Sequence, residues 1–208
     1  MPRLVPTKQQ EEKKTEVEKA ADLAASYAAI GPFLVIHSEA VILPRIQKFL
    51  GYIRSQPEHK KVGAVGFCWG GRYAILLTHA APYVDAAVAN HPSFLSMPGE
   101  IEKIVKPVAI EVGDADTIFT QKDIETTQEI FKTKKDCVIE VYEDQVHGFT
   151  IRGDLSIDKD KKAKEKAAQA VSPDSCHANG SLFRFSTNIC RSAINDKLGL
   201  DTIQSLIQ

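Results

Sequence analysis

The sequence predicts an α/β fold built on a mostly parallel sheet, because apolar strand-like runs alternate with segments of helical composition. The strand-like runs are short and rich in small or β-branched residues, at 61–67, 84–90, 106–113 and 136–143. Segments such as "GGRYAILLTHAA" and "QKDIETTQEIFKTK" fill the intervals between them. Strands that alternate with helices pair in parallel and form a doubly wound sheet.

The composition fits one globular domain that binds neither nucleic acid nor a membrane. The chain has 208 residues, of which 43% are hydrophobic and 25% charged, and its formal net charge is -1. A nearly neutral balance does not favour a polyphosphate partner. No apolar run approaches the ~20 residues of a membrane helix, and "MPRLVPTKQQEEKK" lacks the apolar core of a secretory signal. We therefore expect a cytoplasmic protein, of an oligomeric state that the sequence does not indicate.

Two helical segments are expected before the first strand. Residues 8–19 mix both charge signs without Pro or Gly, which is typical of a solvated helix or a frayed tail. The next segment, "LPRIQKFLGYIRS", predicts an amphipathic helix that opens at Pro44 and extends to residue 55. Its apolar positions recur at helical spacing: Ile46, Phe49, Leu50 and Ile53.

These features predict three regions. Residues 1–32 form a charged segment, helical or disordered, and residues 33–171 form the α/β domain, which ends in a Lys-rich helix at 157–171. Residues 172–208 form a poorly specified, Ser-rich tail. Four cysteines occur singly, without the C-x-x-C spacing of a metal or redox site. We expect reduced thiols, no metal and no cofactor.

The stretch "VGFCWGGRYA" is typical of a nucleophile elbow. Cys68 follows a strand-like run, precedes a helix-like one, and has Gly66 two residues before it and Gly70 two residues after it. The nucleophile of such an elbow has a strained backbone, so we expect the residues two before and two after it to be very small to avoid collision. The N-terminus of the next helix favours a thiolate. The alternative is a buried structural cysteine whose glycine neighbours only let strand and helix pack closely.

Acid and base candidates follow in the order that this kind of site requires, namely nucleophile, acid and histidine. Asp114 and Asp116 come just after the third strand-like run, and His147 comes just after the fourth. Parallel sheets place their chemistry at these carboxyl ends. His91 also follows a strand, but no acid stands between it and Cys68, so it is interpreted as a pocket wall or a hydrogen-bond donor behind the catalytic groups.

Four ordered motifs resemble the dienelactone hydrolase family, in particular its fungal branch: "VGFCWGGRYA", "ANHPSF", "GDADTIFT" and "VHGFTIRGD". The resemblance implies an α/β-hydrolase fold with Cys68 as nucleophile, Asp116 as orienting acid and His147 as base. It also implies that the Trp69 backbone N–H forms part of the oxyanion hole. Arg152 is expected to bind a substrate carboxylate, and His91 to lie in the substrate site.

The sequence departs from this family at both ends. Members carry further strands, and a loop with a second oxyanion donor, before the helix predicted at 44–55, and residues 1–32 show neither. We therefore expect a partial fold, truncated at the N-terminus and divergent at the C-terminus. The strand that ends at Cys68 would then form an open edge lined by Val62, Ala64 and Val65.

The predicted function is hydrolysis of an ester or lactone bond in a small molecule through an acyl-enzyme on Cys68. We expect weak activity, because loss of one oxyanion donor costs about 10²–10³ in turnover. A glutamine amidotransferase is the rival enzyme, but it requires Glu two residues after the histidine, where this chain has Phe149. The rival from another class is a non-catalytic remnant or interaction protein that retains the triad residues.

Overall fold

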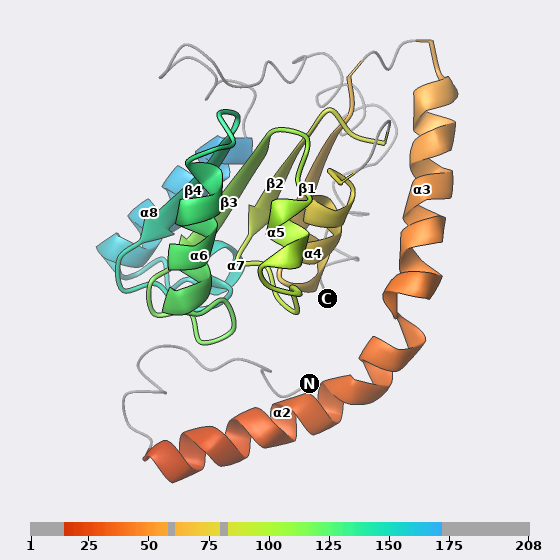
Figure 1. Ribbon diagram of the computed structural model, residues 1–208. Helices are drawn as coiled ribbons and strands as arrows, with labels where there is room; N and C mark the ends of the chain where they lie inside the picture. Colours follow the sequence, from red (N-terminus) through yellow and green to blue (C-terminus); the bar gives the residue numbers. More distant parts are fainter. Residues whose placement is uncertain (1–14, 58–60, 80–82, 172–208) are drawn as a thin grey trace.

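A four-stranded parallel sheet forms the centre of the computed structural model, which describes residues 15–57, 61–79 and 83–171 (Figure 1). The strands lie side by side in chain order: β1 (Gly63–Phe67), β2 (Ala86–Asn90), β3 (Val108–Gly113) and β4 (Cys137–Tyr142). Each lies within one of the four predicted runs, which confirms the α/β class. The predicted tail at 172–208 and the start of the charged run at 8–19 lie outside the described residues.

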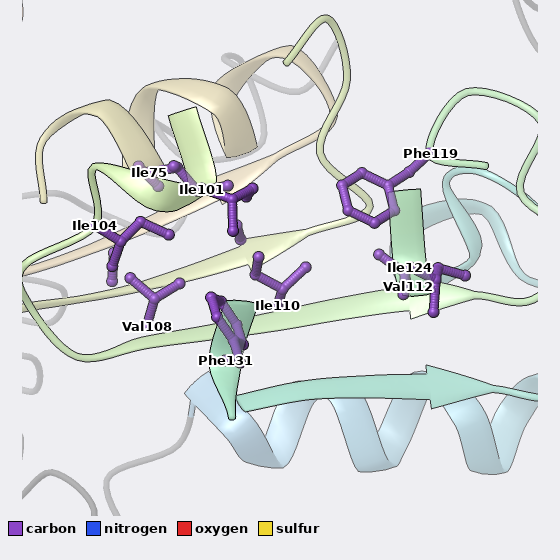
Figure 2. Close-up of a cluster of buried hydrophobic side chains, with 12 residues drawn as sticks. Ile75, Ile101, Ile104, Val108, Ile110, Val112, Phe119, Ile124 and Phe131 are labelled. Carbon is purple, nitrogen blue, oxygen red and sulfur yellow. The ribbon is translucent and has the colours of Figure 1, made fainter. Parts of the chain in front are cut away.

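Helices cover both faces of the sheet. One face packs against α4 (Trp69–Leu76), α5 (Gly99–Glu102) and α6 (Gln121–Phe131), and the other against α7 (Phe149–Arg152) and α8 (Asp158–Val171). Figure 2 shows the larger core on the first face, where Ile110 on β3 lies among side chains of these helices. Burial of this apolar surface is the main source of stability for such a fold.

Two helices that meet at a bend, α2 (Glu16–Ile36) and α3 (Glu39–Ser55), precede the sheet; in Figure 1 α3 runs along one side of the domain and α2 extends away across the bottom of the view. The helix predicted to open at Pro44 begins five residues earlier, because Ser38 and Glu39 start it and Pro44 is tolerated inside. Phe49, predicted to pack, is instead 61% exposed, whereas Leu50 is buried against Val62. At 3.6 residues per turn, Phe49 falls outside the stripe that faces the domain.

The other helix, α2, is continuous across residues 32 and 33, where the sequence suggested a boundary. No single helix in the described ranges is long and apolar enough to cross a bilayer; Ala28–Ile36 and Glu39–Ser55, a pair bent by 52°, meet the length and composition criteria only together.

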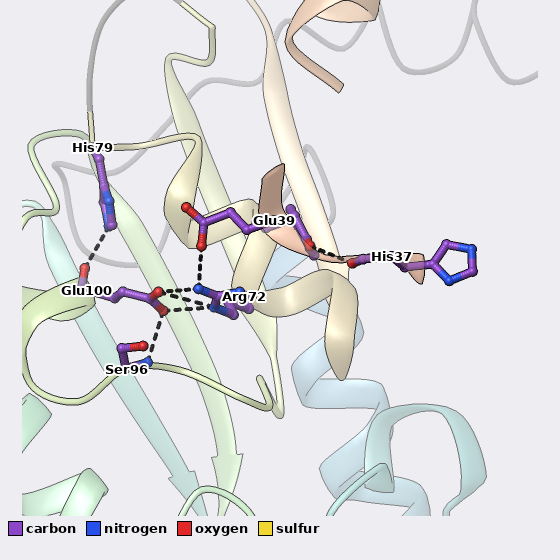
Figure 3. A network of polar contacts seen from close by, with 7 residues as sticks. His37, Glu39, Arg72, His79, Ser96 and Glu100 are labelled. Carbon is purple, nitrogen blue, oxygen red and sulfur yellow. Dashed lines mark hydrogen bonds and ion pairs between the residues drawn. The ribbon is translucent and has the colours of Figure 1, made fainter. Parts of the chain in front are cut away.

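A polar network joins α3 to the helix that follows Cys68 (Figure 3). The Arg72 guanidinium on α4 donates to Glu39 on α3 at 2.5 Å and to Glu100 on α5 at 2.5 to 3.1 Å. The Tyr73 hydroxyl donates to the His37 carbonyl at 3.2 Å. Because the Arg72 and Glu100 side chains are only 16% and 9% exposed, the pair is largely shielded from water and fixes α4 in place.

The first strand is an edge strand of the described sheet, as the sequence suggested. Within the described residues β1 pairs only with β2, and Val65 and Phe67 are 42% and 40% exposed. The prediction was wrong for Val62, which is buried under α3, and Ala64 is half-buried. The exposed residues of β1, Gly63, Val65 and Phe67, alternate along the strand and so share one of its faces, and Phe67 directly precedes Cys68.

Candidate active site

Cys68 occupies the sharp turn between β1 and α4. Its backbone has φ 51 and ψ -117, a conformation that costs a non-glycine residue free energy and recurs at functional sites. The Cys68 N–H donates to the Asn90 carbonyl at 3.0 Å, and the Cys68 carbonyl accepts from Gly71 N–H at 3.0 Å. Backbone bonds on both sides thus hold the strained turn.

Of the two positions predicted to need a very small residue, only one is crowded. A Cβ on Gly66 would lie 2.1 Å from the Gly70 carbonyl oxygen, which is too close for any side chain. A Cβ on Gly70 would have no atom within 4 Å. The prediction was therefore right for Gly66 and wrong for Gly70, whose carbonyl is what crowds Gly66.

The acid and the histidine meet because two loops approach closely at the carboxyl end of the sheet. A Cβ on Gly113 would lie 1.9 Å from the Gln145 carbonyl oxygen, and Ala115 N–H donates to that oxygen at 3.1 Å. With the loops in contact, His147 Nδ1 donates to Asp116 Oδ2 at 2.8 Å. The second oxygen, Oδ1, accepts from the backbone N–H groups of Ile118 and Phe119 at 2.8 and 3.1 Å.

Of the two aspartates in "GDADT", Asp116 is the one that holds the histidine. The side chains of Asp116 and His147 are 0% and 1% exposed, whereas Asp114 is exposed to solvent. Three hydrogen bonds fix the Asp116 carboxylate, and that carboxylate fixes the orientation of the imidazole and puts the hydrogen on Nδ1. The other nitrogen, Nε2, is then the one free to take a proton.

Charge interactions couple His147 to Cys68. Burial disfavours the charged imidazole, but the hydrogen bond to Asp116 and the interaction with Cys68 outweigh it and raise the pKa of His147 to about 9. Burial also disfavours the thiolate, but His147, Ser93 and the Trp69 N–H together lower the pKa of Cys68. His147 Nε2 is buried and makes no hydrogen bond of normal geometry to a described residue, although Cys68 is near enough to shift its pKa. The pair therefore favours thiolate and imidazolium.

The remaining predicted residues lie around this pair. Trp69 begins α4, and its backbone N–H is one of the groups that lower the pKa of Cys68. Arg152 is exposed, and its Nη2 donates to the His147 carbonyl at 3.2 Å. His91 is 1% exposed, its ring lies 5.0 Å from that of His147, and its Nε2 bonds Thr150 Oγ1 at 2.7 Å.

His91 is a neutral neighbour of the pair. Burial, followed by the charges of His147 and Arg152, lowers the pKa of His91 to about 3. Its ring also contacts Phe67 and Phe149. These contacts place His91 behind the candidate base.

Ser93 lies in the motif "ANHPSF", but the sequence alone did not indicate a role for it in the site. Its hydroxyl oxygen lies 3.5 Å from Cys68 Sγ and its side chain is buried. The available signal was its place just after a strand, at the same edge of the sheet as the other candidates. In the described ranges, no group of three His, Cys, Asp or Glu side chains is arranged to hold a metal ion.

Comparisons with known proteins point to one family. The model of the dienelactone hydrolase family matches residues 12–173. The match thus includes most of residues 1–32, where sequence reasoning had found no family feature.

Two curated relatives illustrate the similarity. The hydrolase tropI of Talaromyces stipitatus is 32% identical over 138 residues, 65% of this chain and 53% of the relative. A carboxymethylenebutenolidase homolog of Mus musculus is 24% identical over 135 residues, 63% and 54% of the two chains. This chain therefore spans about half the length of the curated relatives that it matches.

Solved structures show the same fold. A putative dienelactone hydrolase from Klebsiella pneumoniae has a TM-score of 0.53 and 22% identity, covering 64% of this chain and 59% of that one. The dienelactone hydrolase-like promiscuous phosphotriesterase P91 from metagenomic libraries has a TM-score of 0.54 and 25% identity, covering 72% and 65%.

Proposed function

Because this chain belongs to the dienelactone hydrolase family, we propose that it hydrolyses an ester or lactone bond of a small molecule with Cys68 as its nucleophile. The observation that carries the proposal is the buried hydrogen bond between Asp116 and His147, together with the mutual pKa shifts of His147 and Cys68. A nucleophile beside a base that is itself oriented by a third group is the general pattern of covalent hydrolases.

In the first half of the reaction, the Cys68 thiolate attacks the carbonyl carbon and its electron pair forms the C–S bond. The carbonyl oxygen becomes an oxyanion, and the Trp69 N–H at the start of α4 would stabilise it. The intermediate then expels the alkoxide, which takes the proton from His147 Nε2. The products of this half are a thioester on Cys68 and an alcohol, which leaves when the substrate is an ester and stays attached to the acyl group when the substrate is a lactone.

In the second half, water attacks the thioester. His147, now neutral, takes a proton from water through Nε2 while the water oxygen attacks the thioester carbon. The C–S bond breaks, the acid is released, and the thiolate and imidazolium pair is restored. Asp116 keeps the imidazole in one orientation throughout and stabilises its charged form.

Two further residues have proposed roles at the substrate. Arg152, an exposed residue whose guanidinium donates to the His147 carbonyl, would bind a carboxylate on the substrate. His91, buried against the His147 ring, would form the inner wall of the site rather than bind a charged group, because it is neutral. Trp69 supplies the only oxyanion donor that we assign among the described residues, so low turnover is expected.

Hydrolysis of an activated aryl ester and of a simple lactone tests the proposal. We expect Cys68→Ala to abolish turnover, and Cys137→Ala to leave it unchanged, because the Cys137 thiol on β4 donates to the Lys106 carbonyl away from the site. Turnover that survives in Cys68→Ala would contradict the proposal. A folded wild-type protein that hydrolyses neither compound would favour the reading as a non-catalytic interaction protein.

A further inference from the structure

The loop that follows β2 is bonded to the Cys68 turn through its backbone. Cys68 N–H donates to the Asn90 carbonyl at 3.0 Å, and Ser93 N–H donates to the Cys68 carbonyl at 3.1 Å. Two hydrogen bonds of opposite direction therefore connect residues 90–93 to the nucleophile candidate. This arrangement fixes the position of the Ser93 side chain relative to Cys68.

The Ser93 hydroxyl has one partner in the described part of the chain, the Cys68 sulfur. The oxygen and sulfur atoms are 3.5 Å apart, and Ser93 is 1% exposed. Buried hydroxyl groups are nearly always hydrogen-bonded, and a thiolate carries no hydrogen to give. Whenever Cys68 is ionised, the only hydrogen available between the two atoms is that of Ser93.

We propose that Ser93 is a positioning residue that donates its hydroxyl hydrogen to the Cys68 thiolate and holds the sulfur beside His147 before substrate arrives. The role concerns the same site as the proposed function and rests on it for its biological meaning. Charge-assisted hydrogen bonds of this kind are stronger than neutral ones. A second donor also restricts the side-chain rotamer of Cys68, so that the sulfur does not turn away from the base.

The groups around Cys68 come from the loops after β2, β3 and β4 and from the start of α4. The contribution of Ser93 can be measured apart from theirs. His147, with Asp116 behind it, supplies the positive charge, and Trp69 supplies a backbone N–H that no substitution removes. His91 lies against His147, and its low pKa keeps it neutral. Ser93 carries no charge and, unlike the neutral His91, lies against Cys68 itself, so its removal tests one contact with the sulfur without changing the charge of the site.

The first test measures how fast iodoacetamide alkylates Cys68 as a function of pH, with the labelled peptides resolved by mass spectrometry. In Ser93→Ala we expect the midpoint of the pH profile to lie about one pH unit above that of the wild type. At pH values below both midpoints, the variant then contains about tenfold less Cys68 thiolate than the wild type. Ser93→Thr, which keeps the hydroxyl, should retain most of the wild-type midpoint. Ser96→Ala is the matched control, because this serine is in the same loop but exposed.

A midpoint in Ser93→Ala equal to that of Ser96→Ala would overturn the proposal. Should Ser93→Ala not fold, the wild-type protein still decides the question by NMR of the buried Ser93 hydroxyl proton. We expect the chemical shift of this proton to change as Cys68 ionises. A chemical shift that stays constant through the ionisation of Cys68 would overturn the proposal. Neither the alkylation midpoint nor the chemical shift depends on turnover. A protein that shows both effects but hydrolyses no ester would therefore contradict the proposed function and still support the role of Ser93.

Discussion

A single buried hydrogen bond, between Asp116 and His147, orients the base of the candidate site. Asn at position 116 can keep the fold, but it can present an amide N–H to Nδ1 and favour the wrong tautomer. We therefore expect Asp116→Asn to lower ester turnover by a factor on the order of 10⁴. Asp114→Asn, at an exposed neighbour, should cost far less. Steady-state kinetics on the two variants check this, and equal losses would refute the assignment.

The candidate triad could be predicted from the sequence because the identity, order and position after strands of its residues are local features. The residues that surround the triad could not be predicted in this way. Ser93 reaches Cys68 only because the loop after β2 folds back over the turn, which depends on backbone contacts between distant segments. Likewise, Gly113 is needed because a loop more than 30 residues away, at Gln145, passes within van der Waals contact of it.

At the scale of elements, the packing of β1 against α4 depends on the absence of a side chain at Gly66. A Cβ there would lie 2.1 Å from the Gly70 carbonyl oxygen, so strand and helix would have to separate. We expect Gly66→Ala to destabilise the fold by roughly 1–3 kcal/mol and to slow alkylation of Cys68. Gly70→Ala, with open space around its Cβ, is the matched control. Chemical denaturation and iodoacetamide labelling measure both effects, and similar results for the two variants would contradict this reading.

The strands were predictable as elements, whereas the start of α3 was not. Short apolar runs bounded by turn residues indicate β1 to β4 from sequence alone. Proline at position 44 suggested a helix start, since proline is favoured in the first turn. In the structure, Ser38 and Glu39 begin the helix, and the contacts of Arg72 with Glu39 are among those that hold its first turn. Tertiary contacts of this kind override a local signal.

A buried carboxyl group connects β3 to β4 and makes stability depend on pH. Glu111 is 3% exposed and accepts from the Tyr142 hydroxyl at 2.5 Å, and burial raises the pKa of Glu111 from 4.5 to about 7. The unfolded chain loses this proton at lower pH, so the stabilisation is complete below pH 4.5 and is lost as pH rises through about 7.

Glu111→Gln should remove this dependence, since the amide oxygen can still accept from Tyr142. Thermal unfolding about one pH unit above the Glu111 pKa should show the variant more stable than wild type, by up to about 3 kcal/mol. Below pH 4.5 the two proteins should be nearly equal. Glu125→Gln, on an exposed position of α6, serves as the control. A difference that does not change with pH would show that Glu111 does not titrate in this way.

At the scale of the whole molecule, the edge of β1 that is unpaired in the described sheet predicts self-association. Val65 and Phe67 are 42% and 40% exposed on a strand that pairs on one side only within the described residues. Unpaired apolar edges bind other strands, and a lysine on the edge blocks this. Val65→Lys should therefore raise the monomer fraction in sedimentation experiments, and Val105→Lys, in the loop before β3, should not. A wild-type protein that stays monomeric at high concentration would contradict the prediction.

The covalent step itself can be observed by quenching the reaction of the whole protein with a slowly hydrolysed aryl ester in acid. Mass spectrometry of the intact protein and of its peptides then shows where the acyl group resides. We predict one acyl group per chain, on the peptide that contains Cys68, and none in Cys68→Ala. Hydrolysis without any acylated intermediate, or with the acyl group on Cys137 or another residue, would contradict the assignment of Cys68 as the nucleophile.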